Sequence, residues 1–248
     1  MPSGNGGGGS GPSLPPKLQA DHRRFAGAIA PWLERLPLGI QNLQLLTRYG
    51  LLVEEWAGRL SIVSKGDRGE IFTRHVLDSL NPVSIFADPP RTALDVGSGA
   101  GFPGIPLAIV WPTTRWFLVE SREKKAGFLE KAVRELGLAN VKVVCARVED
   151  LAGAGAGVGA GTGLLEGASI ESIFVRAVGG LPDLLETVGP ITAPEARWVY
   201  FLGAASDASG LTASLGSRGS GARVEAGAFG GLLFHGNIGS NVPRGTLP

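Results

Sequence analysis

Closely spaced glycines near residue 95 have the types and spacing needed to hold a nucleoside. The segment runs Asp95-Val-Gly97-Ser-Gly99-Ala-Gly101-Phe-Pro103-Gly104. Glycine lets the backbone come close to a ligand at points where a Cβ would collide with it. A helix beginning after the glycines would offer its free N–H groups to the same ligand. The pattern therefore predicts a nucleoside-binding loop between a strand and a helix.

The spacing of these glycines does not by itself choose the ligand. Gly99 to Gly104 matches the dinucleotide fingerprint G-x-G-x-x-G, and such a match is weak alone. Pro103 suits the first turn of a helix, which places the tight turn at Gly97 to Gly101. Asp95 could then meet the cationic amino-acid end of S-adenosylmethionine (SAM), whereas in a NAD site it would face a pyrophosphate. SAM is therefore favoured, and NAD is the alternative.

Two charged residues end later apolar segments. Glu120 closes the second such segment, where a carboxylate can accept both ribose hydroxyls of an adenosine. Arg176 closes the fourth, where a guanidinium is costly to bury without a partner. We expect Arg176 beside the glycine loop, holding the carboxylate of SAM or a phosphate of the target nucleotide. The structural alternative for Arg176 is an ion pair with Glu149 or Asp95.

Alternating strands and helices would position these residues. Apolar segments predict five strands, at 93–96, 116–119, 141–148, 173–176 and 198–202. Helices are predicted from the glycine loop to Val110 and from Arg122 to Leu136, the latter stopped by Gly137. Strands and helices in this order imply an α/β fold of the Rossmann-like kind, with a parallel sheet and the ligand at the carboxyl ends of its strands.

The chain divides at Asp88-Pro-Pro-Arg91. Residues 1–16 are mostly Gly, Pro and Ser and are predicted to be disordered. Residues 17–90 are predicted to form a small helical N-terminal lobe: residues 17–60 are helical because apolar residues recur there at helical spacing, and a further helix follows over 71–85. Residues 91–248 would form the Rossmann-like domain. A Gly-rich insertion is expected near 153–167 and a shortened helix within 203–221.

Asp95 to Ile109 resembles the signature of the bacterial small-subunit ribosomal RNA guanine-N7 methyltransferases, the RsmG or GidB family. Four further segments support the resemblance: His75-Val-Leu-Asp78-Ser79-Leu80, Glu120-Ser121-x-x-Lys124-Lys125-x-x-Phe128-Leu129, Arg147-Val148-Glu149 and Arg176-Ala177. The resemblance spans roughly residues 43–202. It implies a Rossmann-like, SAM-dependent methyltransferase fold and methyl transfer to N7 of a guanine in 16S ribosomal RNA, free or in the small ribosomal subunit.

The resemblance also implies roles for individual residues. Gly97 and Phe102 would line the SAM loop, Val148 and Glu149 would flank the adenine, and Arg176 would lie at the cofactor-facing end of the fourth strand. Together with the candidates above, the expected cofactor-binding set is Asp95, Gly97, Gly99, Gly101, Phe102, Glu120, Val148, Glu149 and Arg176. Arg176 is also the catalytic candidate.

Such a reaction needs no general base, because N7 of guanine carries a lone pair and no proton. The histidines are His22, His75 and His235, and neither a Cys–His pair nor a metal-binding cluster is evident. His75 lies in a motif, where it would pack the lobes together or touch the substrate.

Departures from the family pattern leave two alternatives open. Ser61 and Val63 stand where the family has Asn and Thr, and Leu202 stands where it has Lys. The chain could therefore be a paralogue with another substrate or reduced activity. The second alternative is not an enzyme but a non-catalytic module that binds a nucleotide.

Composition narrows the setting of this protein. The net charge of +1 counts against extensive contact with phosphates, and the best local basic patch is Arg122, Lys124 and Lys125. The one cysteine, Cys145, suits a reducing compartment and is predicted to be buried in a strand. No apolar run reaches the roughly 18 residues of a transmembrane helix. We expect a cytoplasmic monomer that binds neither metal nor membrane.

Overall fold

The computed structural model describes residues 14–33, 39–151, 163–176, 179–203, 208–215 and 222–238. Of the segment 1–16 that was predicted to be disordered, residues 1–13 lie outside the described residues. Helix α1 begins at Pro16. Of the predicted Gly-rich insertion, only residues 163–167 are described.

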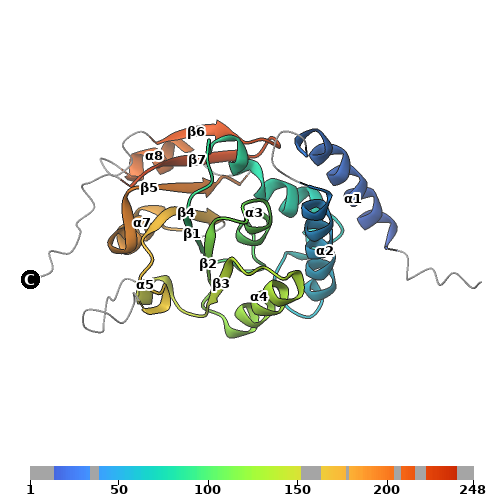
Figure 1. Ribbon diagram of the computed structural model, residues 1–248. Helices are drawn as coiled ribbons and strands as arrows, with labels where there is room; N and C mark the ends of the chain where they lie inside the picture. The colour runs from blue at the N-terminus through green and yellow to red at the C-terminus, as the bar shows by residue number, and fades with distance from the viewer. Residues whose placement is uncertain are drawn as a thin grey trace, which may run out of the picture.

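Seven strands form one sheet in the order β3-β2-β1-β4-β5-β7-β6 (Figure 1). The strands are β1 (Thr92–Val96), β2 (Arg115–Val119), β3 (Val141–Val144), β4 (Ile170–Arg176), β5 (Thr192–Phe201), β6 (Arg223–Ala226) and β7 (Leu232–Asn237). Strands β1 to β5 are parallel, as the sequence predicts. Strands β6 and β7 were not predicted; they extend the sheet as an antiparallel pair beside β5.

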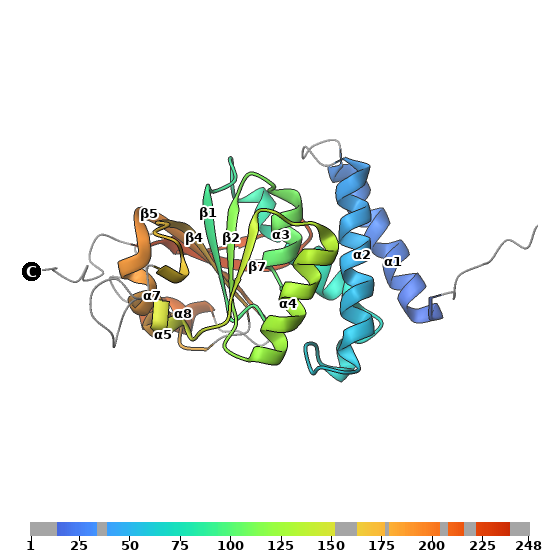
Figure 2. The same ribbon diagram turned by 60° about the horizontal axis from the view of Figure 1, so that its bottom comes forward.

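Helices cover both faces of the sheet, which gives three layers (Figure 2). One face carries α1 (Pro16–Ile29), α2 (Ile40–Ala57), α3 (Gly104–Val110) and α4 (Glu123–Leu136). The other carries α5 (Val148–Leu151), α7 (Leu181–Val188) and α8 (Ala208–Leu215). As predicted, α4 ends where Gly137 adopts a left-handed conformation, with φ of 68°. The predicted α/β fold class is confirmed.

One prediction about local structure held in part and two were wrong. The segment 71–85 is helical, as expected, but not one continuous helix: it contains a π-helical segment, η3 (Phe72–Leu77), and after a break at Leu80 a 3-10 turn, η4 (Asn81–Ser84). Pro82 accounts for the break, because its ring excludes the hydrogen bond that would continue a helix. The third strand ends at Val144 rather than residue 148, and Cys145 is exposed rather than buried. The chain turns here because Asp150 accepts a hydrogen bond from the backbone N–H of Arg147 as α5 begins.

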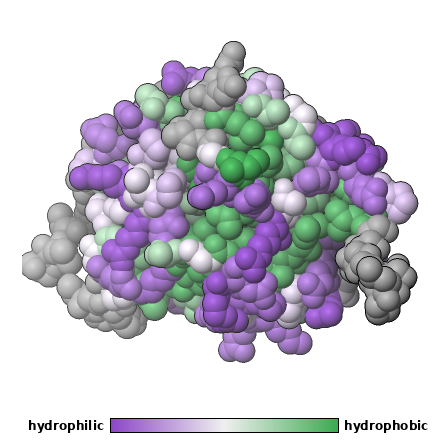
Figure 3. Space-filling model, turned by 45° about the vertical axis from the view of Figure 1, so that its right-hand side comes forward, coloured by the Kyte–Doolittle hydropathy of each residue, from purple (hydrophilic) through white to green (hydrophobic). Residues whose placement is uncertain are grey.

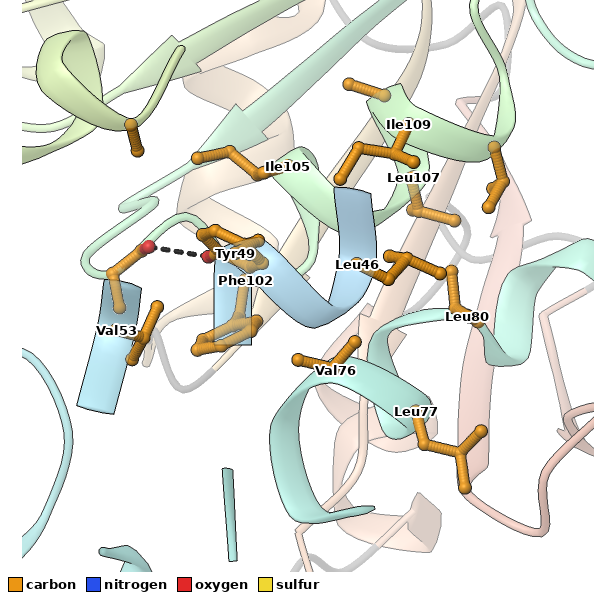
Figure 4. Packing of buried hydrophobic residues seen from close by; sticks show 14 of the residues in the cluster. Leu46, Tyr49, Val53, Val76, Leu77, Leu80, Phe102, Ile105, Leu107 and Ile109 are labelled. Atoms are coloured by element: carbon orange, nitrogen blue, oxygen red, sulfur yellow. Dashed lines mark hydrogen bonds between the residues drawn. The ribbon is translucent and has the colours of Figure 1, made fainter. Parts of the chain in front are cut away.

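The N-terminal helices share one buried cluster with α3 and α4. Figure 4 shows the part of this cluster in which residues of α2 and η3 meet those of α3. Leu46 of α2 and Val76 of η3 are fully buried in it together with Ile105 of α3. The hydroxyl of Tyr49 donates a hydrogen bond of 2.7 Å to the carbonyl of Ala100, inside the glycine loop. The N-terminal helices therefore help to hold the loop that the sequence singles out.

Apolar and hydrophilic residues mix over the face of the molecule shown in Figure 3. Within the described ranges, none of the helices combines the length and the apolar character required to cross a bilayer.

Candidate active site at the carboxyl edge of the sheet

Three adjacent strands end at the same level and bring the main candidates to one edge. Val96, the last residue of β1, pairs with Val119 of β2 and with Val175 of β4. Gly97 and Glu120 follow these ends directly, and Arg176 is the last residue of β4. The fourth strand, which Arg176 ends, therefore lies directly beside the first.

The glycine loop is a tight turn with left-handed backbone at each of its predicted positions. Gly97, Gly99 and Gly101 have φ values of 69°, 57° and 98°, which strain any residue with a side chain. A Cβ on Gly101 would lie 2.7 Å from Ile105 Cδ1 and 2.9 Å from the hydroxyl of Tyr49. A Cβ on Gly99 would meet only the carbonyl of Gly97, at 3.7 Å. The loop thus packs tightly at Gly101 and leaves space for a ligand beside Gly99.

Asp95 lies beneath this loop and is fully buried. Its Oδ2 accepts a hydrogen bond of 3.1 Å from the N–H of Gly104, at the start of α3. Its Oδ1 is buried and has no hydrogen-bond partner within the described part of the chain. Burial raises the pKa of Asp95 to about 7, while the N–H of Gly104 and the charge of Arg176 partly oppose this. An ammonium group is the kind of ligand that would satisfy Oδ1 and favour the ionised carboxylate.

Glu120 joins the glycine loop to the start of α4. One carboxylate oxygen accepts from the N–H of Gly99 at 3.0 Å, and the other accepts from the N–H of Arg122 at 2.9 Å. The residue is only 6% exposed. A carboxylate offers about four acceptor positions, so lone pairs remain for the two hydroxyls of a ribose. These residues therefore fit an adenosine held between the loop and β2.

Phe102 lies at the inner side of the loop, against the N-terminal helices. Its ring is 5.3 Å from that of Tyr49 and stacks on the imidazole of His75 at 5.1 Å. The Nε2 atom of His75 is 3.4 Å from Asp67 Oδ2, without the geometry of a hydrogen bond. Burial and the nearby charge of Arg176 lower the pKa of His75 to about 4, so the ring is neutral at pH 7. His75 packs the N-terminal helices onto the loop.

Arg176 binds Asp78, which differs from both partners expected for a structural role. Its Nη2 is 2.8 Å from Asp78 Oδ2 and donates to the carbonyl of Arg74 at 2.9 Å. Its Nη1 is 3.4 Å from the hydroxyl of Ser79. The alternative of an ion pair for Arg176 is thus present with another partner than Glu149 or Asp95, although the charge of Arg176 still acts on Asp95. Two of these contacts, Asp78 and Ser79, lie in the His75 to Leu80 segment, and Arg74 directly precedes it.

Val148 and Glu149 begin α5, four and five residues after the end of β3. Val148 is half-buried and Glu149 is exposed. Both follow the third strand at the same edge of the sheet, and their contact with an adenine stays a prediction.

Tyr49 is the residue that sequence reasoning missed here; its position on the buried face of α2 was the available signal.

A family model described as rRNA small subunit methyltransferase G (GidB) matches residues 42–213. The chain belongs to this family. The predicted family is thus confirmed, and with it the prediction of a methyltransferase.

Individual members of the methyltransferase G family are similar to this chain over most of their length. The Ribosomal RNA small subunit methyltransferase G of Stutzerimonas stutzeri is 35% identical over 172 residues, which are 69% of this chain and 74% of that protein. The protein of the same name from Cereibacter sphaeroides is 37% identical over 166 residues, 65% of this chain and 73% of that one. A crystal structure of a predicted O-methyltransferase from Agrobacterium tumefaciens shares the fold, with a TM-score of 0.51 and 18% identity, covering 66% of this chain and 82% of that one.

Replacing Glu120 with alanine should weaken the binding of S-adenosylhomocysteine, the demethylated product of SAM, by roughly 1.5–3 kcal/mol, the range for hydrogen bonds to a charged group. The variant should stay folded, because Glu120 follows β2 rather than lying in the apolar core. Titration calorimetry measures the affinity. Glu123→Ala, in the exposed first turn of α4, is the matched control and should bind like the wild type. Equal affinities for all three proteins would remove Glu120 from the site.

Proposed function

We propose that this chain transfers the methyl group of SAM to N7 of a guanine in 16S ribosomal RNA. One observation carries the proposal: β1, β2 and β4 end at the same level. Gly97, Glu120 and Arg176 therefore meet at one edge of the sheet, in a chain that belongs to this family.

The residues at this edge divide into three groups by what they can hold. Glu120 and the left-handed glycines would hold the ribose, because together they offer acceptors and a surface free of side chains. Asp95 would hold the amino group of SAM through its unpartnered oxygen. Val148 and Glu149 would flank the adenine.

Positioning is the main contribution that the protein makes to this reaction. When bound, SAM supplies a methyl group on a sulfonium, which the lone pair of N7 displaces in line without a general base. Holding two reactants in such a geometry can contribute about 7–11 kcal/mol. N7 carries no proton for the neutral His75 to remove. Among the described residues no group of three or more His, Cys, Asp and Glu could hold a metal.

The basic patch at the start of α4 lies next to this site and gives RNA a point of contact. The backbone of Arg122 binds Glu120, and the side chains of Arg122 and Lys124 are exposed. Phosphate contacts of this kind position RNA without reading its sequence.

We propose that the substrate is 16S ribosomal RNA or the small ribosomal subunit, that the protein acts in the cytoplasm and that it acts as a monomer.

Calorimetric titration with S-adenosylhomocysteine and with NAD tests the choice of cofactor. We expect one equivalent of S-adenosylhomocysteine to bind and NAD to give no heat above dilution, because Asp95 favours an ammonium and would repel a pyrophosphate. Binding of NAD without binding of S-adenosylhomocysteine would overturn the proposal in favour of a nucleotide-binding module.

A further inference from the structure

The turn between β6 and β7, residues 227–231, sits directly on the buried side chain of Asn81. Asn81 Oδ1 accepts from the N–H of Phe229 at 2.8 Å and from the N–H of Gly231 at 3.3 Å. The N–H of Ala228 donates to the carbonyl of Asn81 at 3.3 Å. Asn81 is fully buried, so these contacts fix its amide in one orientation. The turn lies beyond residues 42–213, where the family model matches.

The other end of the Asn81 amide binds Asp78. Asn81 Nδ2 donates to the carbonyl of Asp78 at 2.9 Å and to Asp78 Oδ1 at 2.7 Å. The other oxygen of Asp78, Oδ2, is the one that binds Arg176. The two oxygens of this carboxylate are thus divided between Asn81 and Arg176, and the orientation of Asn81 sets the direction that Asp78 presents to the guanidinium.

Two glycines make the contact between the turn and Asn81 sensitive to a single methyl group. A Cβ on Gly227 would lie 2.3 Å from Asn81 Cβ, and one on Gly231 would lie 2.1 Å from Asn81 Nδ2 and 2.4 Å from Asp78 Oδ1. Gly230 in the same turn has φ of 85°, so an alanine there would strain the backbone of the turn, but its Cβ would meet nothing within 4 Å. The turn therefore offers one glycine position that touches Asn81 and Asp78 and another that does not.

We propose that the β6–β7 turn, acting through Asn81 and Asp78, positions the Arg176 guanidinium for methyl transfer. Asn81 is a positioning residue: it contacts neither cofactor nor substrate and acts on Arg176 through Asp78. This inference rests on the proposed function, because it gives Arg176 a part in that reaction. It also gives a role to β6 and β7, which would otherwise only extend the sheet.

A comparison of Gly231→Ala with Gly230→Ala tests this inference. Both substitutions add one methyl group to the same turn, but only the first reaches Asn81 and Asp78. Both are assayed for methyl transfer to small ribosomal subunits and for thermal midpoint, in the wild-type chain and in an Arg176→Ala chain. We expect Gly231→Ala to lose about fivefold or more in transfer rate in the wild-type background and less than about twofold in the Arg176→Ala background. Gly230→Ala should transfer methyl at the wild-type rate in the wild-type background.

A second variant covers the case in which Gly231→Ala does not fold. Asn81→Asp, assayed at pH 8, keeps the acceptor for Phe229 and Gly231 but loses the amide donor that holds Asp78. It should show the same loss and the same dependence on Arg176. Equal losses with and without Arg176, or no loss in either variant, would overturn the inference. A wild-type chain that transfers no methyl group would instead count against the proposed function.

Discussion

Replacing Arg176 with alanine will lower methyl transfer to small ribosomal subunits by about tenfold or more, equal to about 1.4 kcal/mol of transition-state stabilisation. The chain will stay folded, because Arg176 lies at the end of β4 and belongs to neither apolar core cluster. The guanidinium is anchored on one side by Asp78, the carbonyl of Arg74 and Ser79. Its five donors exceed these contacts, which leaves capacity for a carboxylate or a phosphate.

Two further variants separate charge from geometry in this prediction. Arg176→Lys keeps the charge but loses the planar fork, so it should recover only part of the rate. Arg91→Ala is the matched control, because it removes an arginine that pairs with β4 at the opposite edge of the sheet, through Glu171. Transfer at close to the wild-type rate by Arg176→Ala would return Arg176 to a structural role. Full recovery by Arg176→Lys would show that charge alone suffices.

Asp95→Asn will make the chain more stable than the wild type at pH 8 and will weaken its binding of S-adenosylhomocysteine. The pKa of Asp95 is about 7 in the folded chain against a usual value of 3.8. Because the folded pKa is the higher of the two, the free energy of unfolding of the wild type falls as pH rises from about 4 to 7. The fall from this residue is roughly 4 kcal/mol at most, at about 1.4 kcal/mol per pKa unit. Asparagine does not ionise and avoids this loss.

Ligand binding should depend on pH in the opposite sense. The amino group of S-adenosylhomocysteine requires the ionised carboxylate, so wild-type affinity should rise from pH 5.5 to 7.5, by up to about tenfold per unit below pH 7. The affinity of Asp95→Asn should be lower and nearly flat. Urea unfolding and calorimetry at several pH values measure both effects. Asp183→Asn, in the exposed first turn of α7, is the control. Parallel pH profiles for wild type and Asp95→Asn would contradict the assignment.

The sequence predicts the parts of this fold that depend on local patterns. The glycines after β1 and the apolar strands were identifiable because each signal lies within about ten residues. The level ending of β1, β2 and β4 follows from parallel pairing, so Glu120 and Arg176 were expected at the same edge as Gly97. Local pattern and the architecture of the sheet agree at this edge, which is why the main candidates could be named.

Contacts between distant segments were not predictable in the same way. Arg176 is 98 positions from Asp78 in the chain, and Phe229 is 148 positions from Asn81. No spacing rule connects such residues, since their meeting depends on how η3, η4 and the β6–β7 turn pack. Local patterns also misled at Cys145. The apolar run to residue 148 predicted a longer strand, whereas the chain turns after Val144 and Asp150 accepts a hydrogen bond in that turn.

Mass-spectrometric mapping of methylated guanines in 16S ribosomal RNA tests the proposed function most directly. The RNA is taken from a bacterial strain that lacks its own methyltransferase G and carries either the wild-type chain or Arg176→Ala. The wild type should restore 7-methylguanosine at one position, and Arg176→Ala should leave most of the RNA unmodified there. A strain in which the wild-type chain is present and folded but no guanine gains a methyl group at N7 would contradict the proposal.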